Sequence, residues 1–228
     1  MAGADTVQDG NAAFAKGDFP AAVRAYETAL ASGPKSAGLY YNLATAQLKA
    51  GERPQAALNL RRALMLDPGF TDARVSLSEI ERSQGVPAVK ESWQTKVAAK
   101  VPLTAVFVSG AVAFWVGAFV VLAGLFRKKK FAPILAGVIL VVLGAVVFAT
   151  GVWADPKLAD RNAGVIVAAE EVSLLSAPAD QSATLTKLAP SAGVHVIRES
   201  GEWTYCQAPG GEKGWLPSNS LQRVIPAT

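Results

Sequence analysis

The chain has 228 residues, of which 51% are hydrophobic and 18% charged, and its formal net charge at pH 7 is +4. Residues 1–100 carry 12 basic against 10 acidic side chains, residues 127–130 carry four basic ones, and residues 155–228 carry 6 against 8. The short basic run therefore accounts for the net charge, and neither end has the basic surface that nucleic-acid binding requires.

Titratable and nucleophilic residues are scarce. Cys206 is the only cysteine and His195 the only histidine, so the chain has no internal disulfide, no Cys/His set for zinc and no nucleophile paired with a histidine base and an orienting group. No glycine-rich phosphate loop is present either. We therefore expect a protein without enzymatic activity, catalytic residues, metal or cofactor.

Residues 1–87 contain an internal repeat. The segment GDFPAAVRAYETALASGP (17–34) aligns with GERPQAALNLRRALMLDP (51–68), and a spacing of 34 residues is the period of tetratricopeptide repeats, whose units are antiparallel helix pairs. Residues 40–52 are then the first helix of the second unit, and residues 72–84 a capping helix. The matched positions are Gly17/Gly51, Ala22/Ala56, Ala29/Ala63, Leu30/Leu64 and Pro34/Pro68.

Some tetratricopeptide proteins hold a peptide carboxylate in a five-residue clamp. Asn11 and Asn42 match two clamp positions, but the three basic positions are filled by other residues: Val7, Asp72 and Ser76. The resemblance therefore implies a broken clamp. Asn11, Asn42 and Tyr41 remain candidate partner-binding residues, with ordinary groove polarity or helix packing as the alternative.

Residues 88–102 have helical character without repeat markers and predict a connector helix, with Trp93 near a membrane surface. After it, residues 103–126 and 131–154 are two runs of 24 residues without a charge. As helices of about 36 Å, both are long enough to cross the roughly 30 Å hydrocarbon layer. Residues 103–154 are therefore predicted to form a transmembrane helical hairpin rather than buried soluble helices.

The basic residues at the tip of this hairpin predict its orientation, because Lys and Arg beside membrane spans stay on the cytoplasmic side. The flanks at the other end are weaker, and Asp155 and Asp160 offset the second one. We therefore expect a cytoplasmic loop and two periplasmic soluble domains in the inner membrane of a bacterium. The topology residues are Arg127, Lys128, Lys129 and Lys130.

Glycines recur every seven residues in both runs, which keeps one face of each helix in register. Small residues allow close packing of helices in lipid, so we expect a glycine seam with the pairs 110/151, 117/144 and 124/137 at equal depth. Neither run has an ionisable residue, which favours an anchor or a docking surface over transport. The predicted packing residues are Gly110, Gly117, Gly124, Gly137, Gly144 and Gly151.

Residues 163–228 change to short alternating apolar runs bounded by Gly, Pro, Asn and Ser, and predict five or six strands in a small closed barrel. Leu188, Gly193-Val194, GEW (201–203), GW (214–215) and the terminal SNSLQRV resemble bacterial SH3 domains. That resemblance implies a peptide or cell-wall ligand on an aromatic groove. The candidate residues are Trp203, Tyr205 and Trp215.

Alternation along the strand puts Trp203 and Tyr205 on one face and Thr204 and Cys206 on the other, and one of the two faces has to be core. We expect His195 to lie on the surface or half-buried, and Cys206 to be an inert buried thiol rather than a nucleophile.

The order of tetratricopeptide repeats, a two-span hairpin and an SH3-like barrel resembles the BatE family of the bacterial aerotolerance operon. The resemblance implies a multi-domain membrane protein that joins Bat proteins with von Willebrand factor A domains and a MoxR-type ATPase. Two hypotheses remain: an interaction scaffold in this envelope complex, or a cell-wall sensor whose barrel binds peptidoglycan peptides.

Export of the repeats normally needs a signal peptide. The start MAGAD has neither a charged first region nor an apolar core, but Ala2-Gly3-Ala4 has the small-x-small spacing of a cleavage site. We therefore expect a signal peptide that is removed or lies upstream, with the mature chain starting at Asp5 or a nearby residue.

Overall fold

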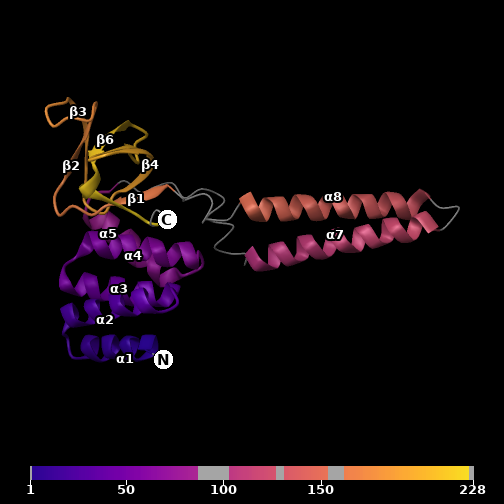
Figure 1. Ribbon diagram of the computed structural model, residues 1–228, viewed down its shortest axis with the longest axis horizontal. Helices are drawn as coiled ribbons and strands as arrows, with labels where there is room; N and C mark the ends of the chain where they lie inside the picture. The colour runs from indigo at the N-terminus through magenta and orange to yellow at the C-terminus, as the bar shows by residue number, and fades with distance from the viewer. Residues whose placement is uncertain (1, 87–102, 127–130, 154–161, 226–228) are drawn as a thin grey trace. The chain divides into compact units, whose positions relative to one another are not determined.

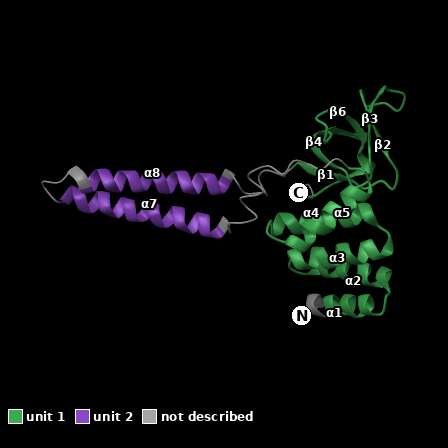
Figure 2. Cartoon of the chain, turned by 180° about the vertical axis from the view of Figure 1, so that it is seen from behind, with its two compact units in different colours: residues 1–90, 160–228 green, residues 91–159 purple. Residues whose placement is uncertain are grey.

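The structure is a computed structural model that describes residues 2–86, 103–126, 131–153 and 162–225. The chain divides into two compact units, the first made of residues 1–90 and 160–228 and the second of residues 91–159 (Figure 2). The predicted connector helix and the four basic topology residues fall outside the described residues.

The first unit begins with five helices that stack in chain order (Figure 1). Their lengths are nearly equal, at 13 or 14 residues, as expected for a repeat. The helices are α1 (Ala2–Ala15), α2 (Phe19–Ser32), α3 (Ala37–Ala50), α4 (Arg53–Leu66) and α5 (Thr71–Ser83).

Glycines end the first helix of each pair. Gly17, Gly51 and Gly85 follow α1, α3 and α5, and their φ angles of 78°, 86° and 68° lie in the left-handed region that glycine adopts without steric cost. The three positions are 34 residues apart, so the period continues one unit further than the aligned segments. A side chain at these positions would strain the turn that reverses the chain.

Alanines at matched positions allow the helices to approach closely. Ala22 and Ala29 in α2, and Ala56 and Ala63 in α4, are at most 1% exposed. Because a larger side chain would separate the helices, this explains why both repeats keep alanine at these places.

The second unit consists of two helices, α7 (Leu103–Phe126) and α8 (Phe131–Trp153). Both are long enough and apolar enough to cross a membrane, judged by length and composition alone. Aromatic contacts between them include Phe107 and Phe148, whose ring centroids are 5.2 Å apart.

The predicted glycines lie between the two helices, but the pairing differs from the predicted one. A Cβ atom added at Gly117 would lie 2.7 Å from the carbonyl oxygen of Gly137, and one at Gly144 would lie 2.7 Å from that of Gly110. The expected pairs 110/151, 117/144 and 124/137 are therefore wrong. The expected pairs require the two helices to be symmetric about residues 130–131. Because α7 ends at Phe126 and α8 begins at Phe131, the midpoint between the helices is at residues 128–129 instead.

Residues 163–223 of the first unit form a seven-stranded antiparallel sheet, here called the β domain, with the order β3-β2-β6-β5-β4-β1-β7. The prediction of five or six strands was therefore too low. The strands are β1 (Ala163–Ile166), β2 (Val172–Leu175), β3 (Thr184–Leu188), β4 (Gly193–Ser200), β5 (Trp203–Gln207), β6 (Lys213–Pro217) and β7 (Leu221–Arg223).

Strand β5 shows which face of the sheet is core. Thr204 and Cys206 are buried, at 1% and 0% exposure, while Trp203 and Tyr205 are half-buried on the opposite face. The core beneath β5 contains Leu174, Val194 and Leu216, among others. Of the two faces that the sequence distinguishes, the one with Thr204 and Cys206 is therefore the core face.

Candidate protein-interaction surfaces

The tetratricopeptide residues do not assemble a clamp. Asn11 lies on α1, where its Oδ1 accepts a hydrogen bond from the hydroxyl of Tyr26 on α2 at 2.7 Å. Burial raises the pKa of Tyr26, which keeps its hydroxyl protonated as the donor. Asn42 is half-buried on α3, and Asp72, at a basic clamp position, is exposed on α5. The hydrogen bond from Tyr26 thus gives Asn11 a structural role between α1 and α2.

Tyr41 is half-buried and its ring lies 5.0 Å from that of Phe70, centroid to centroid. It packs at the edge of the core formed by α3, α4 and α5. Part of the Tyr41 ring is therefore used in helix packing, in agreement with the alternative that Tyr41 is a packing residue, and only the rest is accessible to a partner.

The outer face of the β domain carries a cluster of aromatic side chains, here called the aromatic face. Tyr205 on β5 pairs with Trp215 on β6, and their ring centroids are 5.1 Å apart. Trp203 pairs with Pro217 in the same register. The guanidinium carbon of Arg198 lies 5.3 Å from the centroid of the Trp215 ring. Three candidate residues separated in sequence are thus brought together on two neighbouring strands.

The chemistry of the aromatic face suits a polypeptide ligand. Half-buried Trp and Tyr rings offer large, rigid contact areas with little entropy to lose on binding, and such residues dominate binding energy at protein interfaces. Arg198 adds a positive charge beside the rings. His195, by contrast, is exposed on β4 opposite Gln207 and contacts none of the rings in the described ring contacts.

Cys206 lies on the opposite, buried face, and burial raises the pKa of its thiol to about 11. Reaction with maleimide or iodoacetamide requires the thiolate. This pKa lowers the thiolate fraction at pH 7 about a hundredfold relative to a thiol whose pKa is 9.0, and burial also blocks access. We expect no labelling of the folded chain within an hour and full labelling in denaturant.

A matched control for this labelling is Asn219→Cys in a Cys206→Ala background, because Asn219 is exposed on the turn before β7. It should react at the ordinary rate of a free thiol. Rapid labelling of Cys206 in the native chain would contradict its buried placement.

The helices and the β domain contribute side chains to each other's hydrophobic cores. Val165 of β1 and Val224, which follows β7, are 0% and 3% exposed and belong to the core cluster of Leu58, Leu60 and Ile80 on α4 and α5. In the other direction Val86, just after α5, is 6% exposed and belongs to the core of the β domain. The sequence predicts two separate modules here, whereas in the structure each contributes side chains to the other's core.

Arg62 on α4 holds this junction by hydrogen bonds. Its Nε donates to the carbonyl oxygen of Val224 at 3.1 Å and its Nη2 to that of Arg223 at 3.3 Å. Its Nη1 donates to Oδ1 of Asn59 at 3.1 Å, and Nδ2 of Asn59 donates to Oε1 of Gln47 at 2.8 Å. Burial lowers the pKa of Arg62, but an arginine stays charged in any physiological range. A polar chain therefore runs from α3 through α4 to the end of β7.

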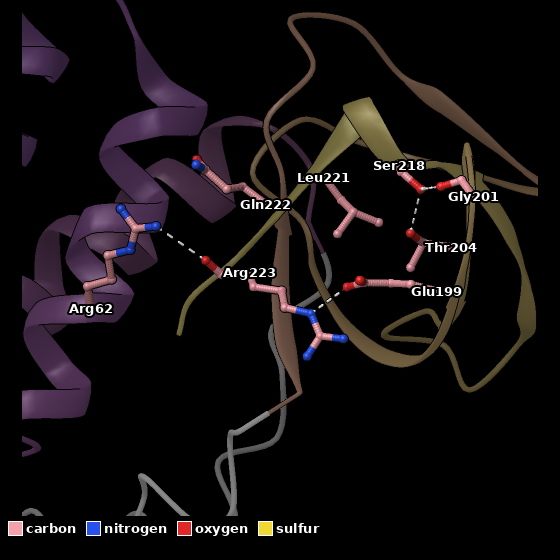
Figure 3. A pocket seen from close by; sticks show the side chains of 8 residues that line it. All are labelled: Arg62, Glu199, Gly201, Thr204, Ser218, Leu221, Gln222 and Arg223. Atoms are coloured by element: carbon pink, nitrogen blue, oxygen red, sulfur yellow. Dashed lines mark hydrogen bonds and ion pairs between the residues drawn. The ribbon is translucent and has the colours of Figure 1, made fainter. Parts of the chain in front are cut away.

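A cavity of about 330 Å³ opens beside Arg62, at the end of the β domain (Figure 3). Its polar groups are largely engaged with one another. The Nε of Arg223 donates to Glu199 at 2.6 Å, and Ser218 contacts both the Thr204 hydroxyl at 2.9 Å and the Gly201 carbonyl oxygen at 3.3 Å. These contacts connect groups that line the cavity, so we assign the cavity to the junction.

Sequence reasoning missed the junction residues. The only local signal is Asn59, a polar residue between Leu58 and Leu60 in an apolar run, which is 4% exposed. Buried amides are hydrogen-bonded, so such a position points to a partner without naming it. Val224 and Val86 carry no signal, because their burial depends on segments that are far away along the chain.

The comparisons with known proteins bear on the helical part. A family profile for the TPR repeat matches residues 10–51. The chain is also similar to the tetratricopeptide repeat and J domain-containing co-chaperone DNJ1 of Cryptococcus neoformans var. grubii, with 34% identity over 82 residues, or 36% of this chain. That match spans 16% of the length of the relative. Tetratricopeptide repeats are therefore present, and they imply a surface that binds other proteins.

Proposed function

We propose that the chain is a membrane-anchored interaction scaffold without enzymatic activity, in a bacterial envelope complex of the MoxR/Bat type. The tetratricopeptide repeats and the β domain, taken as an SH3-like barrel, bind protein partners in the periplasm. The α7–α8 hairpin anchors them in the inner membrane with the basic loop in the cytoplasm. The BatE-like order of domains favours Bat proteins with von Willebrand factor A domains as partners.

One observation carries this proposal: the repeats and the aromatic face belong to one compact unit with a common core. A scaffold has to hold its binding surfaces in a fixed relation, and a shared core does this where a linker does not. The two uncharged helices support an anchor rather than a channel, because neither has an ionisable residue.

Orientation in the membrane is tested by cysteine accessibility in a Cys206→Ala background. Lys35→Cys and Asn219→Cys, both at exposed positions, should react with an impermeant maleimide in intact spheroplasts. Lys129→Cys should react only after permeabilisation, because positive charges keep the loop in the cytoplasm. Labelling of Lys129→Cys in intact spheroplasts would refute the proposed orientation.

The aromatic face is tested by the double variant Tyr205→Ala/Trp215→Ala. Truncating this pair of aromatic side chains at an interface costs about 2 kcal/mol or more in total, so we expect at least a thirtyfold loss of membrane proteins that co-purify from detergent-solubilised membranes. Leu185→Ala, at an exposed position on β3 whose side chain is not one of the paired rings, should have no effect.

The same variants separate the scaffold from a cell-wall sensor. Retention of the wild-type chain on purified sacculi, lost in the double variant while the co-purifying proteins stay, would favour peptidoglycan peptides as the ligand. Unchanged co-purification in the double variant would show that the aromatic face does not bind the partner proteins.

A further inference from the structure

Trp115 has an unusual place in the hairpin. It lies eleven residues from each end of the apolar span Thr104–Phe126, about 17 Å from either end along the helix, and its side chain is 61% exposed. Tryptophan in membrane helices prefers the two interfaces, where its N–H reaches water or headgroups. In a chain that spans the bilayer as proposed above, Trp115 is at the middle of the hydrocarbon instead.

The indole N–H of Trp115 has no hydrogen-bond acceptor in the part of the chain that the structure describes. Its ring pairs with the rings of Phe114 and Phe119, whose centroids are 5.8 and 6.5 Å away. A donor left unpaired in hydrocarbon costs free energy, because lipid tails offer no acceptor. The N–H of Trp115 is therefore stabilised by any neighbouring molecule that offers a hydrogen-bond acceptor at the same depth.

Trp115 belongs to a stripe of large exposed side chains along the side of α7 that faces away from the glycine seam. Successive members are four and three residues apart in alternation, the spacing by which two helices pack with a left-handed crossing. All are at least 51% exposed. The α7 stripe consists of Val108, Val112, Trp115, Phe119, Leu122 and Phe126.

Helix α8 provides an internal comparison. Its central residues, from Val138 to Val146, are exposed only through aliphatic side chains, which suit lipid tails. The polar and aromatic group at mid-depth is thus confined to α7. An apolar groove of about 350 Å³, lined by Leu122 and Leu125 on α7 and Val138 on α8, adjoins the stripe and continues it toward the α7–α8 interface.

A second copy of this chain does not supply the acceptor. The other polar side chains of the described spans are Thr104, Ser109 and Thr150. Ser109 and Thr150 donate to their own helices, at 3.0 and 2.8 Å, and all three lie near the end of the hairpin opposite its loop. In a copy with the same topology, Ser109 is six residues, or about 9 Å, from the depth of Trp115.

We propose that the α7 stripe binds a transmembrane helix of a different membrane protein, and that this helix carries a Ser, Thr, Asn or Gln oxygen near the middle of the bilayer that accepts from Trp115. The inference rests on the proposed membrane anchor and adds the surface and the chemistry of its partner. The groove beside Leu122 receives side chains of the same helix.

The test is photo-crosslinking of the full chain in its native membrane. p-Benzoylphenylalanine replaces Phe119 on the stripe in one variant and Val142 on α8 in the control. We expect the first to form adducts with a transmembrane segment of another protein that has a Ser, Thr, Asn or Gln within about one turn of the crosslinked residue, and the control to crosslink lipid.

Trp115→Phe in the Phe119-probe chain keeps the ring and removes the N–H. Hydrogen bonds between membrane helices contribute modestly, so the adduct yield should fall about threefold to tenfold. Adducts with lipid alone, with a second copy, with segments lacking such a residue, or unchanged by Trp115→Phe would overturn the inference. Carbonate extraction keeps the two proposals apart: release of the chain refutes the anchor, whereas retention without these adducts refutes the α7 stripe alone.

Discussion

Val224→Asp is expected to destabilise α4, α5 and the β domain together. Val224 is 3% exposed and packs in the core that contains Leu58, Ala63 and Ile80. A carboxylate in this apolar core is either desolvated or held neutral, and either state costs several kcal/mol. The nearby Arg62 guanidinium offsets little of this cost, because it already donates to two backbone carbonyl oxygens and to Asn59. A domain is stable by only about 5–15 kcal/mol, so most of the junction should open. Hydrogen exchange read by mass spectrometry should show lost protection in residues 53–83 as well as in β1 and β7.

Two variants control this result. Ile197→Asp adds the same charge to the β domain at a residue that is 45% exposed, and it should leave the protection of α4 and α5 unchanged. Arg62→Met keeps an apolar stem but leaves Asn59 and two carbonyl oxygens without their donor, at a cost of about 1–3 kcal/mol. Protection of residues 53–83 that survives Val224→Asp would show that the helices do not share a core with the β domain.

Gly117→Val is expected to separate α7 from α8. The first carbon of the new side chain would lie 2.7 Å from both the carbonyl oxygen of Gly137 and the backbone nitrogen of Val141. Backbone atoms cannot rotate away, so the helices have to move apart from close contact toward the upper end of the usual 8–10 Å range. We expect spin labels on the exposed residues Val112 and Val142 to move apart by about 2 Å or more.

Ala123→Val is the control, because it places the same valine side chain on α7 at an exposed position. It should leave the label distance unchanged. Equal distances in Gly117→Val and the wild type would mean that the helices do not meet at the glycines. Overpacking should also weaken the association of α7 with α8 by about 1–3 kcal/mol.

Local periodicity explains what sequence reasoning predicted well. The repeat of 34 residues rests on Gly17 and Gly51, which adopt left-handed turns, and on alanines that let helices touch. The seven-residue spacing of glycine identifies the face by which α7 and α8 meet. The spacing does not say which residues lie opposite one another, because a shift by seven residues, or two helical turns, keeps the same face. The structure places Gly117 beside Gly137 rather than Gly144.

The aromatic face was predicted as a set of residues but not as a surface. Alternation separates Trp203 from Thr204 without saying which of them is core. The structure decides it through the packing of Leu174 and Leu216 against the β5 face that carries Thr204 and Cys206. Arg198 was absent from the prediction, because its contact with Trp215 requires the pairing of β4, β5 and β6.

By itself, the sequence determined the paired helices, the two uncharged helices with their glycine face, and the change to strands after residue 162, since each follows from the spacing of neighbours along the chain. Only the tertiary structure decided that Val224 and Arg62, 162 residues apart, meet in one core. Such a contact depends on the free energy of burying two distant surfaces against each other, and no local pattern encodes it.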